Sequence, residues 1–394
     1  MADVAEPAGN YPYLADGGAG IGLADDLVTV SRYGEDVGEA TRSRAEKLLA
    51  SAPAVSLHEH PTRLPDPLTA ETWRAFRESA RAYLGFRGLA ASGMSAVFCN
   101  AWSFAPAADV RAFLARTRAD IAHHDGFFTG ESAGDLDRTR GTGGADGVAL
   151  YGSLESATAF ADDLDAWEEL YGLGVRMAGL CYNDGNAFGQ GLAAGDGDEG
   201  LTAQGRAFVD LAGRLGIIVD LGHVGDRTSL DTIEASDGPV VISHAGARAL
   251  WPTPRMKPDG VLRALADKGG VLGVSAAPNT TRSGDHPEHS IASFVDHLTY
   301  AVELMGINHV GLGPDTMFGH HAGIHALGRG DGDKQWGKHS GRESGGLVEH
   351  VDGVENPREC FVNVASWLVD AGWSDDDVLA VLGGNARRVM EAVL

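Results

Sequence analysis

Short apolar runs rich in β-branched residues alternate with longer amphipathic segments from residue 52 to the end of the chain. Such runs, bounded by turn residues, are typical of buried strands, whereas the segments between them repeat their apolar positions with the period of a helix. Several helical segments are followed by glycine, as a helix C-cap should be. The pattern predicts strands at Pro53–Glu59, Met94–Ala101, Gly147–Leu154, Val175–Tyr182, Ile217–His223, Pro239–His244, Gly270–Ser275 and His309–Pro314.

Eight strands that alternate with helices indicate parallel βα units, and eight such units predict a closed (β/α)8 barrel of the TIM type. A doubly wound open sheet is the alternative fold, but no GxGxxG motif follows the first predicted strand. Residues 1–50 are expected to form an N-terminal extension that ends in a lead-in helix at Ala40–Ala50. Residues 51–394 are then the barrel domain.

Two segments show neither pattern and are expected to be loops. Residues 126–146 are rich in glycine and aspartate, and Met317–Pro357, after the last predicted strand, is rich in glycine. Loops as long as the second are commonly functional lids or disordered. It contains the histidines His320, His321, His325, His339 and His350.

The composition narrows the class of protein. With 394 residues, 43% of them hydrophobic, the chain can bury a large core. A formal charge of −24 argues against binding to nucleic acid or to anionic membranes. The sequence has no run of about 18 apolar residues and no secretory signal, so we expect a cytoplasmic protein without a membrane span. The cysteines Cys99, Cys181 and Cys360 form no CxxC pair, which argues against a disulfide framework and a cysteine-rich zinc site.

Two histidines, His58 and His60, stand at the end of the first predicted strand, in the stretch AVSLHEHPTRLPD. A polar loop after a strand is one interpretation of this motif. The other is a metal site, because alternate residues of a strand point the same way and two imidazoles can then bind one ion. Glu59, between them, should point away from the ion and serve a structural role.

The ends of the other predicted strands favour the metal. A barrel enzyme carries its chemistry at the C-terminal ends of its strands. A lone histidine there is more often a hydrogen-bonded core residue, but four histidines and two carboxylates on one rim indicate a metal site. Imidazole and carboxylate ligands without thiolate suit Zn²⁺, with Mn²⁺, Fe²⁺ or Co²⁺ as alternatives. The candidates are His58, His60, Glu155, His223, His244 and Asp315.

This arrangement of histidines and aspartate resembles the amidohydrolase superfamily. Many of its members with two metal ions bridge them with a carboxylated lysine on the fourth strand. None of the lysines of this chain ends a predicted strand. The bridging ligand is therefore expected to be a carboxylate side chain, and Glu155 is the one in a suitable position.

A closer resemblance lies in residues 199–250, which contain DLGHVGD and VISHAGAR, and in the C-terminal residues 368–393. Both segments are similar to the membrane (renal) dipeptidase family of zinc metallopeptidases. The resemblance runs from about Val55 to the C-terminus. It implies a zinc-dependent barrel enzyme, and the family also suggests a homodimer.

The resemblance implies a role for each candidate ligand. His58 would bind the first zinc ion, Glu155 would bridge both ions, and His223 and His244 would bind the second. His60 stands where the family has an aspartate. Its spacing still makes it the natural ligand, but it replaces an anionic ligand by a neutral one, so the identity of the metal stays open.

The resemblance also implies residues that act on the substrate. Asp315 matches an aspartate that transfers protons, and Arg255 matches an arginine that binds the C-terminal carboxylate of the substrate. Tyr182 stands where the family has a substrate-contacting histidine, and it can still donate a hydrogen bond to a carbonyl oxygen. The family motif Asp-Phe-Asp-Gly after the last strand is replaced here by Asp-Thr-Met-Phe at residues 315–318.

Together these features predict a dipeptidase with two divalent ions, most simply Zn²⁺. A hydroxide held between the ions would attack the peptide bond of a dipeptide that has a free C-terminal carboxylate. Another reaction of the superfamily is the alternative, namely hydrolysis of an N-acyl amino acid, a lactam or a lactone. A third hypothesis is a binding or biosynthetic role on the same scaffold, although a binding protein has no need for Asp315.

Overall fold

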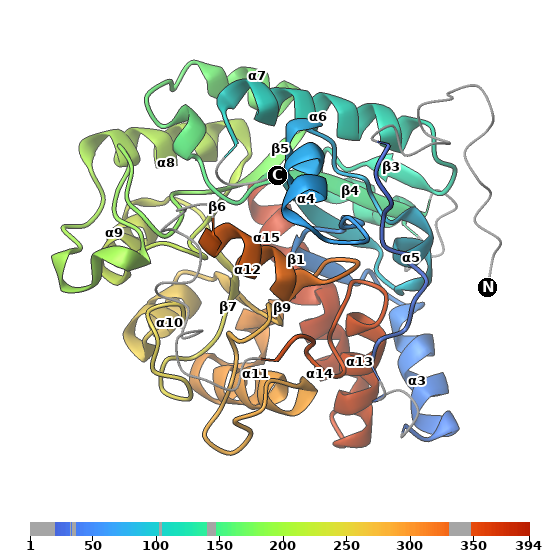
Figure 1. Cartoon of the computed structure of the whole chain (residues 1–394). Coiled ribbons are helices and arrows are strands. Elements are labelled where there is room, and N and C mark those ends of the chain that lie inside the picture. The colour runs from blue at the N-terminus through green and yellow to red at the C-terminus, as the bar shows by residue number, and fades with distance from the viewer. Residues whose placement is uncertain (1–19, 32, 34–36, 102–104, 140–146, 331–347) are drawn as a thin grey trace.

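Eight parallel strands form a closed barrel that helices surround (Figure 1). The computed structural model describes residues 20–31, 33, 37–101, 105–139, 147–330 and 348–394. The barrel strands are β1 (Val55–Glu59), β2 (Ala96–Ala101), β4 (Val148–Leu154), β5 (Val175–Gly179), β6 (Ile218–Asp220), β7 (Val241–Ala245), β8 (Val271–Val274) and β9 (Val310–Leu312). Their order is β2-β1-β9-β8-β7-β6-β5-β4, and pairing of β2 with β4 closes the ring. Each predicted strand overlaps one of these strands, so the (β/α)8 prediction is confirmed.

One further strand, β3 (Phe127–Thr129), pairs with residues 148–150 at the beginning of β4. The prediction of a loop at 126–146 is therefore wrong in part, because this segment also contains the 3₁₀ helix η1 (Ala133–Arg138). A strand of this length is too short to show an alternating pattern, and its partner β4 supplies the backbone hydrogen bonds. Residues 140–146 lie outside the described part of the chain.

Helices lie between consecutive strands, as parallel pairing requires, and further helices precede β1 and follow β9. They are α3 (Glu39–Leu49), α4 (Ala70–Glu78), α5 (Phe86–Ala91), α6 (Ala107–Ala122), α7 (Ala166–Gly172), α8 (Ala203–Leu215), α9 (Asp226–Ala235), α10 (Asp259–Asp267), α11 (Ile291–Met305), α12 (His321–Gly330), α13 (Cys360–Asp370), α14 (Asp375–Leu379) and α15 (Asn385–Val393), with shorter turns η3 (Thr158–Phe160), η4 (Leu192–Gly197), η5 (Ile307–His309) and η6 (Ala380–Gly384). The local signals agree with these bounds at α8. The Thr202 hydroxyl accepts a hydrogen bond from the Gly205 N–H at 2.9 Å, and Gly216, with φ of 76°, ends the helix.

The helix α3 confirms the predicted lead-in helix before β1. It buries Ala45, Leu48 and Leu49 and packs beside α13.

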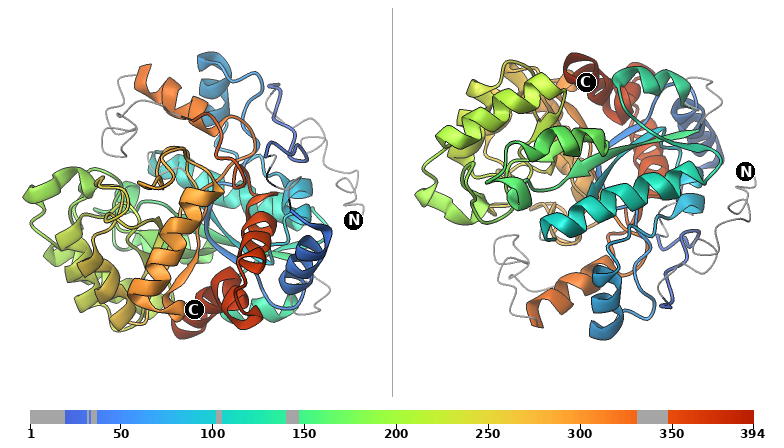
Figure 2. Two further views of the ribbon diagram at one scale, coloured as in Figure 1. Left: turned by 90° about the horizontal axis from the view of Figure 1, so that it is seen from below. Right: turned by 90° about the horizontal axis from the view of Figure 1, so that it is seen from above.

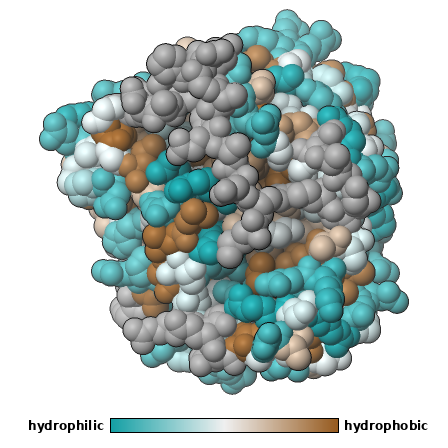
Figure 3. Space-filling model, turned by 90° about the vertical axis from the view of Figure 1, so that its right-hand side faces the viewer, coloured by the Kyte–Doolittle hydropathy of each residue, from teal (hydrophilic) through white to brown (hydrophobic). Residues whose placement is uncertain are grey.

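On the face of the molecule shown in Figure 3, hydrophilic residues cover much of the rim, and hydrophobic residues gather nearer the centre. Among the residues that the structure describes, no helix combines the length and the apolar character needed to cross a membrane.

The chain leaves the ring after β1 and again after β9, and the two excursions meet. Figure 2 shows α4 and α12 side by side, standing away from the barrel. The prediction of a loop at Met317–Pro357 is therefore wrong in part, because the segment contains α12. The excursions share a small apolar core formed by Leu64, Trp73, Phe76, Tyr83, Met317 and Ile324. Residues 331–347, which include His339, lie outside the described residues.

The barrel interior is filled by apolar side chains from the beginnings of the strands. Val55 and Leu57 of β1 belong to this cluster, and Val389 and Met390 of α15 close it at the N-terminal end of the barrel. Packing of this kind makes the barrel a solid core rather than a pore. The polar residues are thereby confined to the opposite mouth.

Two strands are irregular where they carry histidines. The pairing of β1 with β2 shifts its register between Ser56 and Glu59, and the pairing of β7 with β8 shifts between Ile242 and Ala245. Such bulges re-aim side chains and are common next to active sites. In β1 the shift lets His58 face the interior directly after Leu57, which also faces the interior.

Two glycines allow the strands around β7 to approach closely. A Cβ atom at Gly273 of β8 would lie 2.0 Å from the Ser243 carbonyl oxygen, and one at Gly313, after β9, would lie 1.7 Å from it. Both distances are far below van der Waals contact. Neither position has room for a side chain unless the backbone moves.

His297 of α11 ties together the loops that follow β7 and β8. Its Nδ1 accepts a hydrogen bond from the Ala247 N–H at 2.9 Å, and its Nε2 donates one to the Arg282 carbonyl at 2.6 Å. Burial lowers the pKa of His297 to about 4, against the smaller opposing effect of the bond to Arg282. The neutral ring makes both bonds, and protonation would break the bond to Ala247.

We therefore expect the metal-free protein to lose stability as the pH falls from about 6.5 towards 4. The pKa of His297 is lower in the folded state, so the unfolded chain binds the proton more readily and stability is fully present only above the ordinary pKa. Between pH 7.5 and pH 5 this group should cost about 2 kcal/mol of unfolding free energy. Urea unfolding at both pH values measures the loss. His297→Gln should reduce it, and the control His309→Gln should not. An equal loss in both variants contradicts the prediction.

Candidate metal centre

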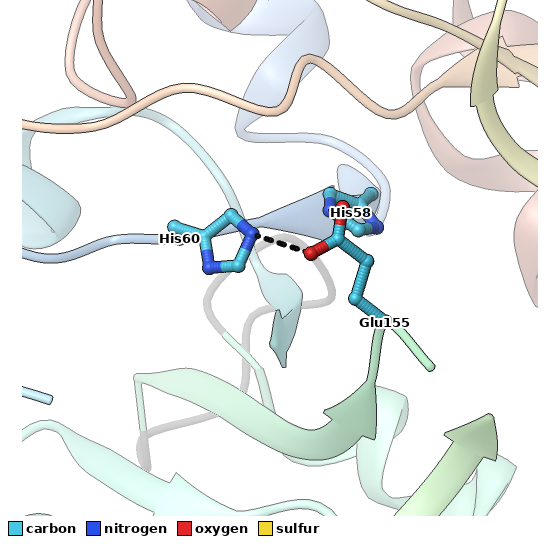
Figure 4. A group of neighbouring side chains, drawn as sticks. All are labelled: His58, His60 and Glu155. Carbon is cyan, nitrogen blue, oxygen red and sulfur yellow. Dashed lines mark ion pairs between the residues drawn. The ribbon is translucent and has the colours of Figure 1, made fainter. Parts of the chain in front are cut away.

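The six candidate residues lie together at the C-terminal mouth of the barrel. The histidines and Glu155 are buried, and the side chain of Asp315 is 13% exposed. Figure 4 shows His58 of β1 and His60, which directly follows that strand, beside the Glu155 carboxylate, which follows β4. The six side chains come from five different strand ends, namely those of β1, β4, β6, β7 and β9.

Glu155 is the centre of this group. Its Oε1 lies 3.1 Å from His223 Nε2, 3.5 Å from His244 Nε2 and 4.0 Å from His58 Nε2. Its Oε2 lies 3.7 Å from His60 Nε2, the pair marked in Figure 4. Each oxygen of one carboxylate thus faces a different set of imidazoles, which is the arrangement expected of a bridging ligand.

Asp315 completes the group on the side of β1. Its Oδ1 lies 3.6 Å from His58 Nε2 and 3.8 Å from His60 Nε2. The Asp315 backbone has a φ of 60°, which is rare for a residue with a side chain, and its N–H donates to the His58 carbonyl at 3.0 Å. Strain of this kind persists only where the surroundings hold it in place.

Glu59 supplies part of that support. Its Oε2 accepts hydrogen bonds from the Thr316 N–H at 2.7 Å and from the Thr316 hydroxyl at 2.9 Å. The side chain therefore points to the segment that carries Asp315 and away from His58 and His60, as predicted. A residue between two candidate ligands on β1 thereby fixes the backbone beside a third candidate after β9.

The donor set fits divalent ions. The candidate ligands form three groups, and within each group the ligand atoms lie within 4.8 Å of one another. The groups are His58, His60 and Glu155; His58, His244 and Asp315; and Glu155, His223 and His244. His58 Nε2 is buried and has no hydrogen-bond partner among the described residues. Burying an imidazole nitrogen without a partner costs free energy. A cation bound beside Glu155 would give this nitrogen a partner. The atoms are nitrogen and oxygen without thiolate, as Zn²⁺ and related ions accept.

Burial keeps His58, His223 and His244 in the neutral form that can bind a metal. It lowers the pKa of His58 well below the usual range, and it lowers the pKa of His223 to about 4 with further help from the nearby Arg255. Burial and Arg255 also lower the pKa of His244. Burial alone would raise the pKa of Glu155, but the surrounding imidazoles hold it well below its usual range. Burial alone would lower the pKa of His60, but Glu155 and Asp315 raise it above its usual range. At neutral pH His58, His223 and His244 therefore present lone pairs beside the Glu155 carboxylate.

The two predicted substrate residues lie on the His223 side of the mouth. Tyr182 stacks on His223 with ring centroids 4.0 Å apart and planes 24° apart. Arg255 is buried, and its Nη1 donates to the Gly222 carbonyl at 3.0 Å. Its Nη2 is buried without a hydrogen-bond partner. The guanidinium thus keeps a donor for which the described residues provide no acceptor.

Three polar residues that the sequence does not indicate as partners of the candidate ligands lie next to them in the structure. Asn183 Oδ1 lies 2.8 Å from His223 Nδ1, and Ser243 Oγ lies 2.7 Å from His244 Nδ1. Asp220 accepts the Ser243 hydroxyl at 2.6 Å. Their common signal is a small polar residue on, or just after, a barrel strand that is otherwise apolar.

The histidines after β9 form separate contacts. His350 Nδ1 lies 2.7 Å from Glu355 Oε1, and the rings of His320 and His350 are 5.7 Å apart. The rings of His321 and His325 on α12 are 4.9 Å apart. None of these described histidines belongs to the groups of ligand atoms around Glu155.

Comparison with known sequences gives one family. Residues 42–327 match the family described as Membrane dipeptidase (Peptidase family M19). The chain is 32% identical over 219 residues to Dipeptidase aclJ of Aspergillus oryzae, covering 55% of this chain and 45% of that protein. It is 29% identical over 222 residues to Dipeptidase tcpJ of Claviceps purpurea, covering 56% and 45%. The chain thus spans about half the length of these curated relatives.

Solved structures share the fold. An amidohydrolase from Pseudomonas aeruginosa superposes with a TM-score of 0.72 at 25% identity, covering 89% of this chain and 98% of that one. A metallo peptidase from Rhodobacter sphaeroides, liganded with a phosphinate mimic of the dipeptide L-Ala-D-Ala, superposes with a TM-score of 0.64 at 19% identity, covering 87% and 100%.

Proposed function

Since the chain belongs to the membrane dipeptidase family, we propose that it is a metal-dependent dipeptidase with two divalent ions. Its substrates would be dipeptides with a free C-terminal carboxylate. The observation that carries the proposal is the position of Glu155, whose two oxygens face His223 and His244 on one side and His60 on the other. The dipeptide mimic bound by the Rhodobacter sphaeroides protein supports the same substrate class.

We assign His58, His60 and Glu155 to one ion, and Glu155, His223 and His244 to the other, with Zn²⁺ as the proposed metal. Two such ions, when bound, polarise a carbonyl group and lower the pKa of water to about 7. The protein provides the rest of the chemistry through side chains that move protons and orient the substrate.

Asp315 is the proposed acid–base group. Its Oδ1 lies 3.6 Å from His58 Nε2, so a water molecule at the ligand cluster would be within its reach. The carboxylate takes one proton from the attacking water and returns it to the nitrogen of the leaving amine as the peptide bond breaks. Because the Thr316–Glu59 bonds hold the adjacent backbone, Asp315 keeps one orientation through both transfers.

Arg255 and Tyr182 would orient the dipeptide. The Arg255 guanidinium presents a planar fork that fits a carboxylate, and no described residue accepts a hydrogen bond from its Nη2. A carboxylate bound there sets a fixed distance between the C-terminus and the scissile bond, which selects dipeptides over longer chains. The Tyr182 hydroxyl, on a ring stacked against His223, can donate a hydrogen bond to the carbonyl oxygen under attack.

We expect protein purified without chelator to hold about two divalent ions per chain, and Glu155→Gln to hold fewer, because the change removes the charge that both ions share. Elemental analysis of the dialysed protein measures the content. Glu169→Gln changes an exposed glutamate paired with Arg111, and it should leave the metal content unchanged. Full occupancy after Glu155→Gln contradicts the bridging role.

Amidation of the substrate tests the role of Arg255. If Arg255 binds the C-terminal carboxylate, Arg255→Ala and an amidated dipeptide should each lower kcat/KM by an amount equivalent to about 2–5 kcal/mol. Combining them should cost little more than either alone, since both remove the same interaction. Arg255→Lys should recover only part of the loss, because an ammonium group cannot reproduce the fork.

The matched control is Arg248→Ala, which removes a neighbouring arginine paired with Asp226. This variant should keep the full preference for the free carboxylate. The dipeptidase proposal would be contradicted if the losses of kcat/KM from Arg255→Ala and from amidation were additive. Equal turnover of free and amidated dipeptides by the unchanged protein would contradict it as well. Hydrolysis of N-acyl amino acids, lactams or lactones would then become the better hypothesis.

A further inference from the structure

One hydroxyl group touches two of the candidate ligands. Ser243 Oγ lies 2.7 Å from His244 Nδ1 and 3.2 Å from His58 Nδ1. The two rings stack with centroids 3.5 Å apart, although they come from β7 and β1. Ser243, His58 and His244 are fully buried, so water does not compete for these contacts.

Asp220 determines where the Ser243 proton points. Asp220 Oδ2 accepts the Ser243 hydroxyl at 2.6 Å. Its Oδ1 accepts two backbone hydrogen bonds, from the Ser243 N–H at 2.7 Å and from the Gly222 N–H at 3.0 Å. A carboxylate has only acceptors to offer, so the hydroxyl is the donor in the pair.

The direction of that bond fixes both imidazoles. With its proton on Asp220, Ser243 Oγ offers only lone pairs to His58 Nδ1 and His244 Nδ1. Each ring must then carry its proton on Nδ1 to make the bond. Each Nε2 is left with a lone pair that faces Glu155, which is the atom a metal needs.

We propose that Asp220 and Ser243 form one positioning unit that sets the tautomer of His58 and His244, and thereby prepares both halves of the metal centre through a single hydroxyl. The inference rests on the proposed metal centre. In that assignment His58 and His244 bind different ions, so loss of the unit should lower the affinity for both ions. His223 has a different partner at Nδ1, namely Asn183 Oδ1, while its Nε2 lies 3.0 Å from His244 Nε2.

Asp220→Asn tests the direction of the bonds with little change of shape. The amide oxygen keeps the two backbone bonds at the Oδ1 position, so the NH2 group faces Ser243 and donates to it. The Ser243 proton must then point to an imidazole Nδ1, which forces that ring to carry its own proton on Nε2. Zn²⁺ affinity, measured by competition with a chromophoric chelator, should fall roughly 10- to 100-fold.

Ser243→Ala removes the hydroxyl without reversing it. Both rings then lose their preference between tautomers, so both ions should bind more weakly, but less so than in Asp220→Asn. Two controls change buried groups elsewhere. Ser366→Ala removes a hydroxyl bound to the Val362 carbonyl, and Asp231→Asn alters an aspartate that accepts the Leu201 N–H. Both should bind Zn²⁺ as the unchanged protein does.

A second measurement reads the tautomers themselves. Two-bond ¹H–¹⁵N spectra of the metal-free protein with labelled histidine distinguish Nδ1–H from Nε2–H rings. The signals of the two residues are identified by their loss in His58→Asn and His244→Asn. We expect Nδ1–H in both residues, and Nε2–H in at least one of them after Asp220→Asn.

The outcomes separate this inference from the proposed function. Absence of Zn²⁺ binding by the unchanged protein would refute the metal centre, while the spectra would still report the tautomers. Unchanged affinity in Asp220→Asn and Ser243→Ala, or Nε2–H rings in the metal-free protein, would overturn the inference. If Asp220→Asn does not fold, Ser243→Ala and the spectra of the unchanged protein decide the question.

Discussion

The burial of one carboxylate among four imidazoles is the constraint on which the mouth of this barrel depends. The Glu155 oxygens lie between 3.1 and 4.0 Å from the Nε2 atoms of His58, His60, His223 and His244. A buried charge is costly unless it is paired, and neutral imidazoles that point their lone pairs at a carboxylate would add repulsion. The arrangement therefore needs positive charge between these groups, from protons or from divalent ions. The bulged strands β1 and β7 and the polar partners behind the rings fix the side chains of that cluster.

The sequence pattern predicts the barrel and the meeting of the candidate ligands for a physical reason. Parallel strands end at one rim, so residues such as His223 and His244 at strand ends come together whatever their distance along the chain. The pattern does not predict β3, because a three-residue strand takes its stability from β4. It also misses α12, whose apolar residue Ile324 packs against side chains from the excursion after β1.

The supporting residues are harder to predict than the ligands. Ser243 and Asp220 are small polar residues within apolar strands, and nothing in their local pattern says which ring each contacts. Their partners depend on the bulges in β1 and β7, which change the direction of side chains by one residue. Glu59 shows the same limit. Strand alternation predicts that its side chain points away from His58 and His60. Its hydrogen bonds to Thr316 cannot be predicted in this way, because they form only when the closed barrel brings β1 next to β9.

The close approach of Gly273 and Gly313 to the Ser243 carbonyl has a consequence for how this site can evolve. At a proposed ligand position such as His60, another side chain with a donor atom could take its place and give the centre a different charge. The two glycines allow no such exchange, because every other amino acid would bring a Cβ atom to within about 2 Å of a backbone oxygen. The proposed ligand positions can therefore exchange side chains, whereas Gly273 and Gly313 cannot do so without moving the backbone that spaces the strands.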